Sequence, residues 1–95
     1  MVHDFEYAKF VTKHEIIKLS PIENIILDEL LKNKHETTTY GQLFSRLKYI
    51  SETYDCDDVI SRGALRPHIQ RLNKKMYRYM NIKVYTKVGY FLQVI

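Results

Sequence analysis

The sequence predicts an α+β domain in which three helices lie between a short N-terminal antiparallel sheet and a C-terminal β-hairpin. Two patterns carry this expectation. Apolar residues recur at spacings of three and four through the middle of the chain, and short β-branched and aromatic runs occupy both ends. At 95 residues the chain has room for one core, so we expect residues 1–95 to form a single domain.

The N-terminal sheet is predicted from two short apolar runs, residues 7–11 and residues 16–19. The second run is too short for a helix, and the polar residues 12–14 suit a turn between the two. We therefore expect a small antiparallel pair of strands.

The first helix has a clear start signal. Ser20 can cap the helix, Pro21 suits the first helical position, and Glu23 can reach back to the capping residue's amide. We expect this helix to end near Lys34. Its buried face is predicted to hold Ile22, Ile25, Ile26, Leu30 and Leu31.

The second helix is predicted to follow a short strand of three threonines at residues 37–39. Thr39 and Gln42 form a second capping box at its start. Its buried stripe is predicted to hold Leu43, Phe44, Leu47 and Ile50. The polar and acidic residues 51–59 are expected to form a loop.

The third helix is predicted between Arg62 and Tyr79, with Leu65, Ile69, Leu72 and Met76 within about 60° on a helical wheel. The opposite side displays Gly63, Arg66, Pro67, Gln70, Arg71, Lys74 and Arg78. Proline beyond the first turn removes a helical hydrogen bond. Either this helix therefore begins later, near Arg66, or it is kinked at Pro67.

Two strands, residues 82–85 and 89–92, are predicted around a turn at Thr86 and Lys87. We call this C-terminal hairpin the wing. Three helices followed by such a hairpin are typical of the winged helix-turn-helix fold, with the second and third helices as the helix-turn-helix unit.

Charge is unevenly distributed along the chain. Residues 1–60 carry seven Lys and Arg against all eleven acids, whereas residues 61–95 carry eight Lys and Arg and no acid. Such a tract favours a polyanionic partner through counterion release, although a merely solvated basic face is the alternative interpretation. Gln70, Arg66 and Arg71 are the best candidates for base contact, with Asn73 also able to read adenine. Lys74 and Arg78 are expected at phosphates.

Four segments resemble the effector domains of OmpR/PhoB-type bacterial response regulators. Residues 68–76 resemble the recognition-helix pattern V-H-I-x-R-L-R-K-K-L, and residues 88–92 resemble the V-G-Y-R-L that follows the wing turn. Residues 19–27 resemble the L-T-P-x-E-x-x-L-L of the first helix, and residues 39–43 stand where S-R-E-Q-L opens the second. The four segments occur in the family's order and cover roughly residues 15–95.

This resemblance implies a bacterial transcriptional regulator with its third helix in the major groove and its wing in the adjacent minor groove. The helix contacts that it implies are Gly63, Pro67, His68, Gln70, Arg71 and Asn73, with Thr86 and Lys87 at the wing. With the residues from the charge pattern, the predicted DNA-binding set is Arg62, Gly63, Arg66, Pro67, His68, Gln70, Arg71, Asn73, Lys74, Arg78, Thr86 and Lys87. We expect this chain to act without a receiver domain. It departs from the family by the position of Pro67 and by having Thr86 and Lys87 where the wing turn has R-G.

Other classes of function have little support in the sequence. The acidic run at residues 55–58 lacks calcium-loop or zinc spacing, and no glycine-rich phosphate loop is present. We expect no enzyme activity, no metal site and no cofactor. The single cysteine, Cys56, and the absence of a signal peptide or long apolar run favour a cytoplasmic protein without membrane contact.

The sequence therefore predicts a sequence-specific regulator that binds duplex DNA as a homodimer or as tandem copies, with a transcription-machinery protein as a further partner. The alternative is a winged-helix module that binds a protein partner instead of DNA, because a fold does not fix a function. The sequence does not give the target sequence, the controlling signal, or whether transcription is activated or repressed.

Overall fold

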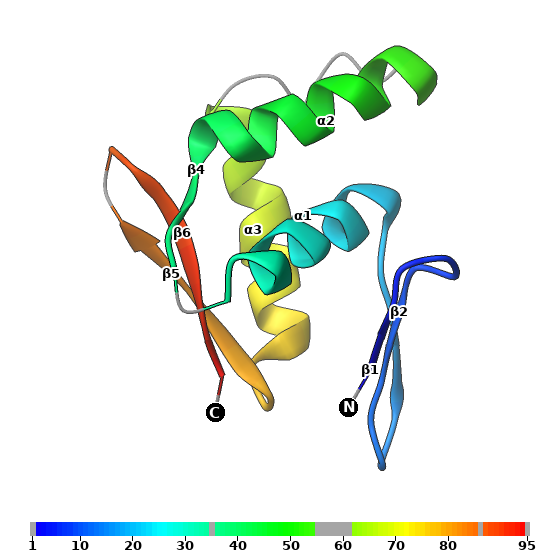
Figure 1. Cartoon of the computed structure of the whole chain (residues 1–95). Helices are drawn as coiled ribbons and strands as arrows, with labels where there is room; N and C mark the ends of the chain where they lie inside the picture. The colour runs from blue at the N-terminus through cyan, green and yellow to red at the C-terminus, as the bar shows by residue number, and fades with distance from the viewer. Residues whose placement is uncertain (1, 35, 55–61, 86, 95) are drawn as a thin grey trace.

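A computed structural model of the chain describes residues 2–34, 36–54, 62–85 and 87–94. The elements follow in the order β1 (Val2–Asp4), β2 (Lys9–Val11), β3 (Ile16–Lys18), α1 (Pro21–Lys32), β4 (Thr38–Thr39), α2 (Tyr40–Tyr54), α3 (Arg62–Met76), β5 (Met80–Tyr85) and β6 (Gly89–Val94). One antiparallel sheet has the order β1-β2-β3 and the other has the order β4-β6-β5. The helices stand between the two sheets (Figure 1), which confirms the predicted α+β winged helix-turn-helix architecture.

The core lies where the three helices meet the inner face of the β4-β6-β5 sheet. The predicted stripes of α2 and α3 are buried, with Leu43, Leu47, Leu65 and Leu72 at most 1% exposed. The fully buried Leu27 of α1 is an addition to the predicted stripe, while Ile22, Leu31 and Phe44 pack at the margin of the core. Apolar spacing along each helix therefore determines which face is buried.

The N-terminal sheet differs from the predicted pair of strands. It has a third strand, β1, which pairs with β2, and β2 begins at Lys9 instead of residue 7. The reason is a turn at residues 5–8, in which the Asp4 carboxylate accepts from the Tyr7 amide at 3.2 Å. Ala8 closes this turn with a positive φ of 52°, and its carbonyl accepts from the Leu19 amide at 2.9 Å.

The start of α1 has both hydrogen bonds of the predicted capping box. The Ser20 hydroxyl accepts from the Glu23 amide at 3.1 Å, and the Glu23 carboxylate accepts from the Ser20 amide at 2.8 Å. The same carboxylate oxygen accepts from Lys75 of α3 at 2.7 Å, and Lys75 also donates to the Lys18 carbonyl at 3.1 Å. α1 ends at Lys32, two residues before the predicted end.

Two boundaries correct the sequence prediction. α2 continues to Tyr54, so residues 51–54 are helical instead of forming a loop, because the sequence has neither glycine nor proline between Gln42 and Tyr54 to end the helix. The rest of the predicted loop and the side chain of Ile50 lie outside the described residues. α3 begins at Arg62, which rules out a start near Arg66 and leaves Pro67 inside the helix without an amide to donate.

The wing sheet is closed by a close approach of β4 to β6. Thr39 is the register partner of Gly89, and Thr39 with Gln42 forms the predicted second capping box. A Cβ atom on Gly89 would lie 2.0 Å from the Thr38 carbonyl oxygen, so only glycine fits here. The turn between β5 and β6 is closed by a bond from the Val88 amide to the Tyr85 carbonyl at 2.9 Å.

We expect Gly89→Ala to lower the free energy of unfolding by about 2 kcal/mol or more, because the new methyl group would push apart two backbones. Gly41→Ala is the matched control, since its Cβ would meet nothing closer than the Thr39 hydroxyl at 3.8 Å. That variant should be neutral or more stable by up to about 1 kcal/mol. Urea unfolding of the three proteins measures both values. Equal stability of the Gly89 variant and the wild type would contradict the close approach of β4 to β6.

We expect Glu23→Gln to lower the free energy of unfolding by about 1–3 kcal/mol at neutral pH, since it removes the charge that faces Lys75. Burial raises the pKa of Glu23, but hydrogen bonds from Lys75 and from the Ser20 amide outweigh burial and hold the pKa below 4.5. The carboxylate therefore stabilises the fold above pH 4.5, and this contribution is lost as the pH falls through the lowered pKa.

Thermal unfolding of wild type and Glu23→Gln should be measured from neutral pH down through the lowered pKa of Glu23. We expect the difference in free energy of unfolding between the two proteins to become smaller as the pH falls. Lys32→Ala serves as the control, because the pair of Lys32 with Asp28 is 61% exposed on the lysine side and should contribute less than about 0.5 kcal/mol. If the stability difference between wild type and Glu23→Gln does not change with pH, the charged pair of Glu23 and Lys75 is not the cause of that difference.

Candidate nucleic-acid interface

The exposed side of α3 is formed by Arg66, Pro67, Gln70, Arg71 and Lys74, which we call the outer face. Four of these residues, Pro67, Gln70, Arg71 and Lys74, line a shallow hollow on the surface. The opposite side of the helix is buried, because Leu65, Ile69, Leu72 and Met76 are at most 6% exposed. One side of α3 thus builds the core, while the other presents cations and an amide to solvent.

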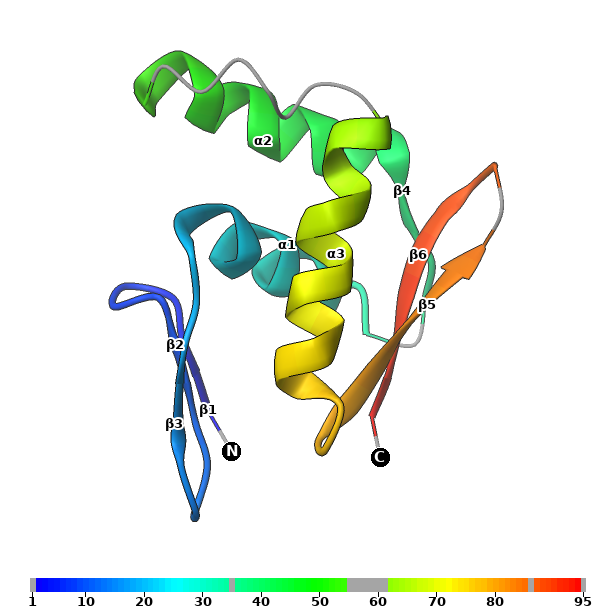
Figure 2. The same ribbon diagram turned by 180° about the vertical axis from the view of Figure 1, so that it is seen from behind.

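Figure 2 shows the outer side of the molecule, with α3 in front and a sheet on either side of it. The N-terminal sheet stands on one side and the wing on the other. The turn of the wing lies at the same end of the molecule as the start of α3. This is the arrangement in which a helix can enter a groove while a hairpin reaches the neighbouring backbone.

His68 and Arg71 are bonded to each other one helical turn apart. The Nη2 atom of Arg71 lies 2.8 Å from Nδ1 of His68, and the imidazole is half-buried. Burial and the charge of Arg71 lower the pKa of His68, and the charge of Glu23 opposes them only in part. The ring is therefore neutral at neutral pH, with Nδ1 as the acceptor.

Lys75 is a structural position that the sequence pattern did not single out. On the wheel it lies about 90° from the centre of the buried stripe, at the margin of the helix, beside His68. From there its ammonium group reaches Glu23 of α1 and the Lys18 carbonyl at the end of β3. A lysine at such a margin, facing a capping-box glutamate, is the signal that could have identified this contact.

Asn73 lies at the other margin of α3, toward the wing. Its Oδ1 atom accepts from the Ile82 amide at 3.0 Å, and the side chain is half-buried. The amide oxygen therefore joins α3 to β5. As a predicted base contact, Asn73 would have to use its NH₂ group.

The remaining predicted residues lie at the two ends of the interface. Lys87 is exposed in the wing turn with a φ of 68°, and Thr86 lies outside the described residues. Arg62 and Gly63 open α3. Arg78 follows the end of α3, is exposed, and donates through Nε to the Tyr77 hydroxyl at 3.3 Å. The structure therefore brings Arg66, Pro67, Gln70, Arg71 and Lys74 onto one face and places Arg78 beyond the helix.

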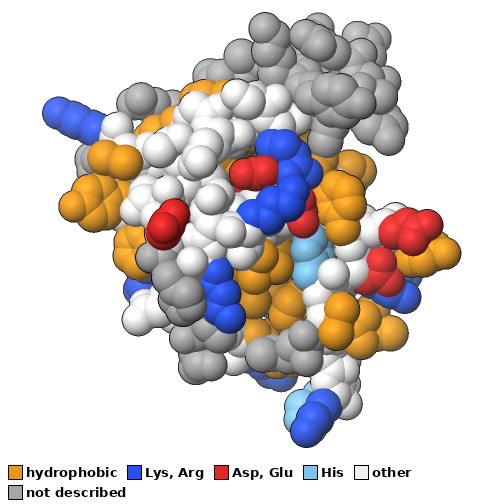
Figure 3. All heavy atoms as spheres, viewed as in Figure 1, with side chains coloured by type: hydrophobic (Ala, Val, Ile, Leu, Met, Phe, Trp, Pro, Cys, Tyr) orange, Lys and Arg blue, Asp and Glu red, His pale blue; other side chains and the backbone are white. Residues whose placement is uncertain are grey.

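Charge on the α1 side contrasts with that of the outer face. Figure 3 views this side, where acidic and basic side chains lie next to each other, and Arg46 of α2 pairs there with Asp28 and Glu29 of α1. Over residues 65–76 of α3, by contrast, Lys75 is the one cation in an ion pair with an acid. The cations of the outer face thus keep their charge available for an external anion.

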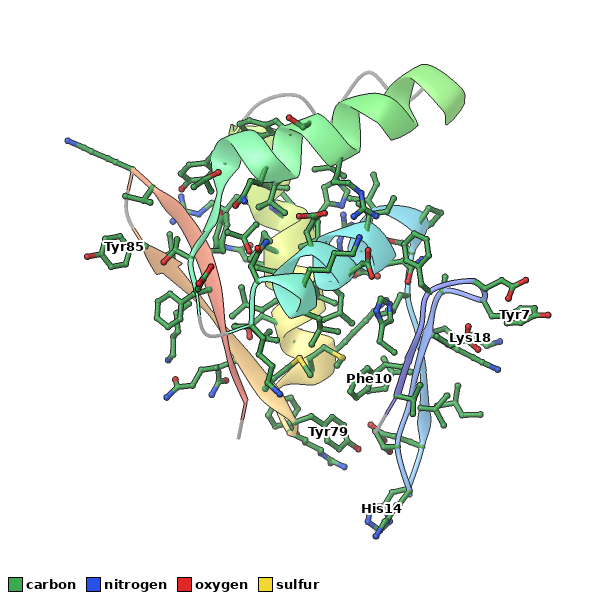
Figure 4. The ribbon with its side chains drawn as sticks, in the orientation of Figure 1. Tyr7, Phe10, His14, Lys18, Tyr79 and Tyr85 are labelled. Atoms are coloured by element: carbon green, nitrogen blue, oxygen red, sulfur yellow. The ribbon has the colours of Figure 1, made fainter. Side chains whose placement is uncertain are left out.

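Aromatic residues have different surroundings in the two sheets. Phe10 of β2 packs against Tyr79 with ring centroids 6.0 Å apart, and Figure 4 shows the two rings between the N-terminal sheet and the α3–β5 turn. The hydroxyl of Thr12 lies 3.3 Å from that of Tyr79. In the wing, Tyr85 is 58% exposed and points away from the helices (Figure 4). The contacts of Phe10 and Thr12 with Tyr79 hold the N-terminal sheet in position beside α3, whereas Tyr85 stays exposed on the wing.

Within the described ranges, His, Cys, Asp and Glu side chains do not gather in any group of three or more that could bind a metal ion. Over the same residues, no helix has the length and apolar character that crossing a membrane requires.

No family model matches the sequence, and no curated protein matches it. Among solved structures it is similar to the C-terminal domain of the nisin resistance regulator NsrR, a lantibiotic response regulator. The match has a TM-score of 0.72 and 27% identity, and it covers 94% of this chain and 88% of that one. The chain is thus similar in fold and sequence to the winged-helix effector domain of a response regulator, as the sequence motifs predicted.

Proposed function

We propose that this chain is a transcriptional regulator that binds duplex DNA in a sequence-specific manner. α3 would lie in the major groove, and the wing would contact the minor groove or the backbone. The observation that carries the proposal is the outer face, where Arg66, Arg71 and Lys74 are exposed around Gln70 without an acidic neighbour on the same helix.

The side chains of the outer face match the chemistry of base edges and phosphates. A guanidinium can bond O6 and N7 of guanine, and the Gln70 amide can bond N6 and N7 of adenine. Lys74 lies about 40° from Gln70 on the helical wheel and can neutralise a phosphate that borders the groove. The acid-free tract from residue 61 to residue 95 adds a long-range attraction for the duplex.

The structural neighbour gives independent support for a regulatory role, because it is itself a domain of a response regulator. We include in the proposal the predicted contact residues at the ends of the interface, Arg62, Gly63, Thr86 and Lys87. Asn73 and Arg78 also remain proposed contacts, and His68 remains in the proposed interface through its bond to Arg71. A regulator of this kind acts where the DNA is, which in a bacterium is the cytoplasm.

Association of two copies on the DNA is part of the same proposal, because one winged helix reads few base pairs. The outer surface of the N-terminal sheet offers a candidate contact. Val2, Val11 and Ile16 are register partners across β1, β2 and β3, and Val2 and Ile16 are 63% and 60% exposed. Such an apolar row favours a protein partner, either a second copy or a protein of the transcription machinery.

Selection of bound oligonucleotides from a random pool, followed by titration at several salt concentrations, tests the proposal. We expect the wild type to bind the selected duplex more tightly than a scrambled one, with affinity that falls as salt rises. Arg71→Ala with Lys74→Ala should weaken binding by about tenfold or more, and each lost phosphate contact should reduce the salt slope by about 0.9.

The double variant Lys32→Ala and Lys34→Ala is the matched control, because it removes the same net charge from the end of α1. We expect the affinity of this control to stay within about twofold of the wild type. The proposal fails if no duplex is enriched and bound, or if both double variants weaken binding equally. Biological activity that survives the Arg71 and Lys74 changes would instead favour a module that binds a protein.

A further inference from the structure

The bond between His68 and Arg71 joins the margin of α3 to its outer face. The fold does not need this contact. The two side chains are three residues apart on the same helix, and the Nη2 to Nδ1 distance is 2.8 Å. Neither is among the buried core residues, and α3 is already held by its apolar stripe and by Lys75. The bond uses one N–H of a guanidinium that has five, so the others stay available to a ligand.

The bond requires a neutral imidazole. An arginine only donates, so Nδ1 of His68 must be the acceptor and the ring proton must be on Nε2. The charged groups near this ring are Arg71 and Lys75 on α3 itself and Glu23 on α1, and Glu23 is already engaged by Lys75. Protonation at Nδ1 would remove the acceptor and place a second positive charge against the guanidinium.

We propose that His68 is a positioning residue for Arg71, holding the guanidinium ready for the DNA when its ring is neutral and releasing it when the ring is protonated. This inference rests on the proposed DNA-binding function. A long arginine side chain loses conformational freedom when it binds, so a partner that restrains it beforehand strengthens binding. DNA affinity should therefore fall as the solution becomes acidic.

The sign of this pH dependence separates two roles of the histidine. If His68 contacted a phosphate directly, its protonated ring would bind more tightly, and affinity would rise in acid. If it positions Arg71, protonation breaks the contact and affinity falls. Histidines elsewhere in the chain contribute a background that is common to the wild type and to variants of His68.

Titration of the selected duplex at about pH 7.5 and about pH 5.5, at constant ionic strength, tests the inference. His68→Gln keeps an amide oxygen that can accept from Arg71 but does not titrate, whereas His68→Leu has no acceptor. We expect the affinity of the wild type to fall about three- to tenfold in acid relative to His68→Gln. His68→Leu should be weaker than His68→Gln at both pH values by a similar factor.

The same substitutions in an Arg71→Ala background show whether His68 acts through Arg71. There we expect the differences between histidine, glutamine and leucine to disappear. Persistent differences in that background, an unchanged ratio of the wild type to His68→Gln, or a wild type that binds more tightly in acid would each overturn the inference. In those cases the proposed function stands, whereas a wild type that binds no duplex at either pH overturns both.

Discussion

The buried carboxylate of Glu23 links the start of α1 to Lys75 of α3, which is 52 residues away in the sequence and also binds the end of β3. It accepts from the Ser20 amide at the start of α1 and from Lys75 near the end of α3, and Lys75 also donates to the Lys18 carbonyl of β3. A carboxylate that is only 2% exposed is tolerable because each of these donors compensates its lost hydration. Through Lys75, this group holds α3 against α1 and the end of β3.

The two margins of α3 contact different parts of the fold. Because the margins and the buried side make these contacts, the outer face is left available to a ligand. His68 and Lys75 lie at the margin that turns toward α1, and Asn73 lies at the margin that turns toward β5. Leu65 and Leu72 occupy the buried side between them. The described residues of the outer face make no contact that the fold needs, so their composition can be selected for a ligand.

Features that follow from local sequence were predictable. The capping box of Ser20 and Glu23 and the apolar stripe of α3 depend on residues within one or two helical turns, and the structure has both. The fold class followed from the order of these elements. β1 was missed because Val2, His3 and Asp4 carry no strand pattern of their own and become a strand by pairing with β2.

Contacts that polar side chains make with other elements were the other limit of prediction. The pairing of Lys75 with Glu23 spans 52 residues, and the bond from the Ile82 amide to Asn73 depends on where β5 starts. A helical wheel gives the direction in which Asn73 points, but it does not identify the group that Asn73 contacts there. The sequence therefore predicts the exposed candidates of α3 better than those at its margins.

Two residues other than glycine, Ala8 and Lys87, adopt a positive φ, and the fold explains both conformations. Ala8 adopts a positive φ, and the fold accounts for it because its carbonyl accepts from Leu19 at the junction with α1. The tight wing turn likewise accounts for the left-handed conformation at Lys87, which costs a residue other than glycine about 1 kcal/mol.

The turn does not account for a lysine at this position, since glycine would close it without that cost. Pro67 poses the same question inside α3, where it removes a backbone hydrogen bond and the outer face gains no core contact in return. Departures from local preference tend to persist where function requires them. Both of these lie on the surfaces that we propose meet the DNA, and a cation at the wing turn is the residue that a phosphate backbone would select.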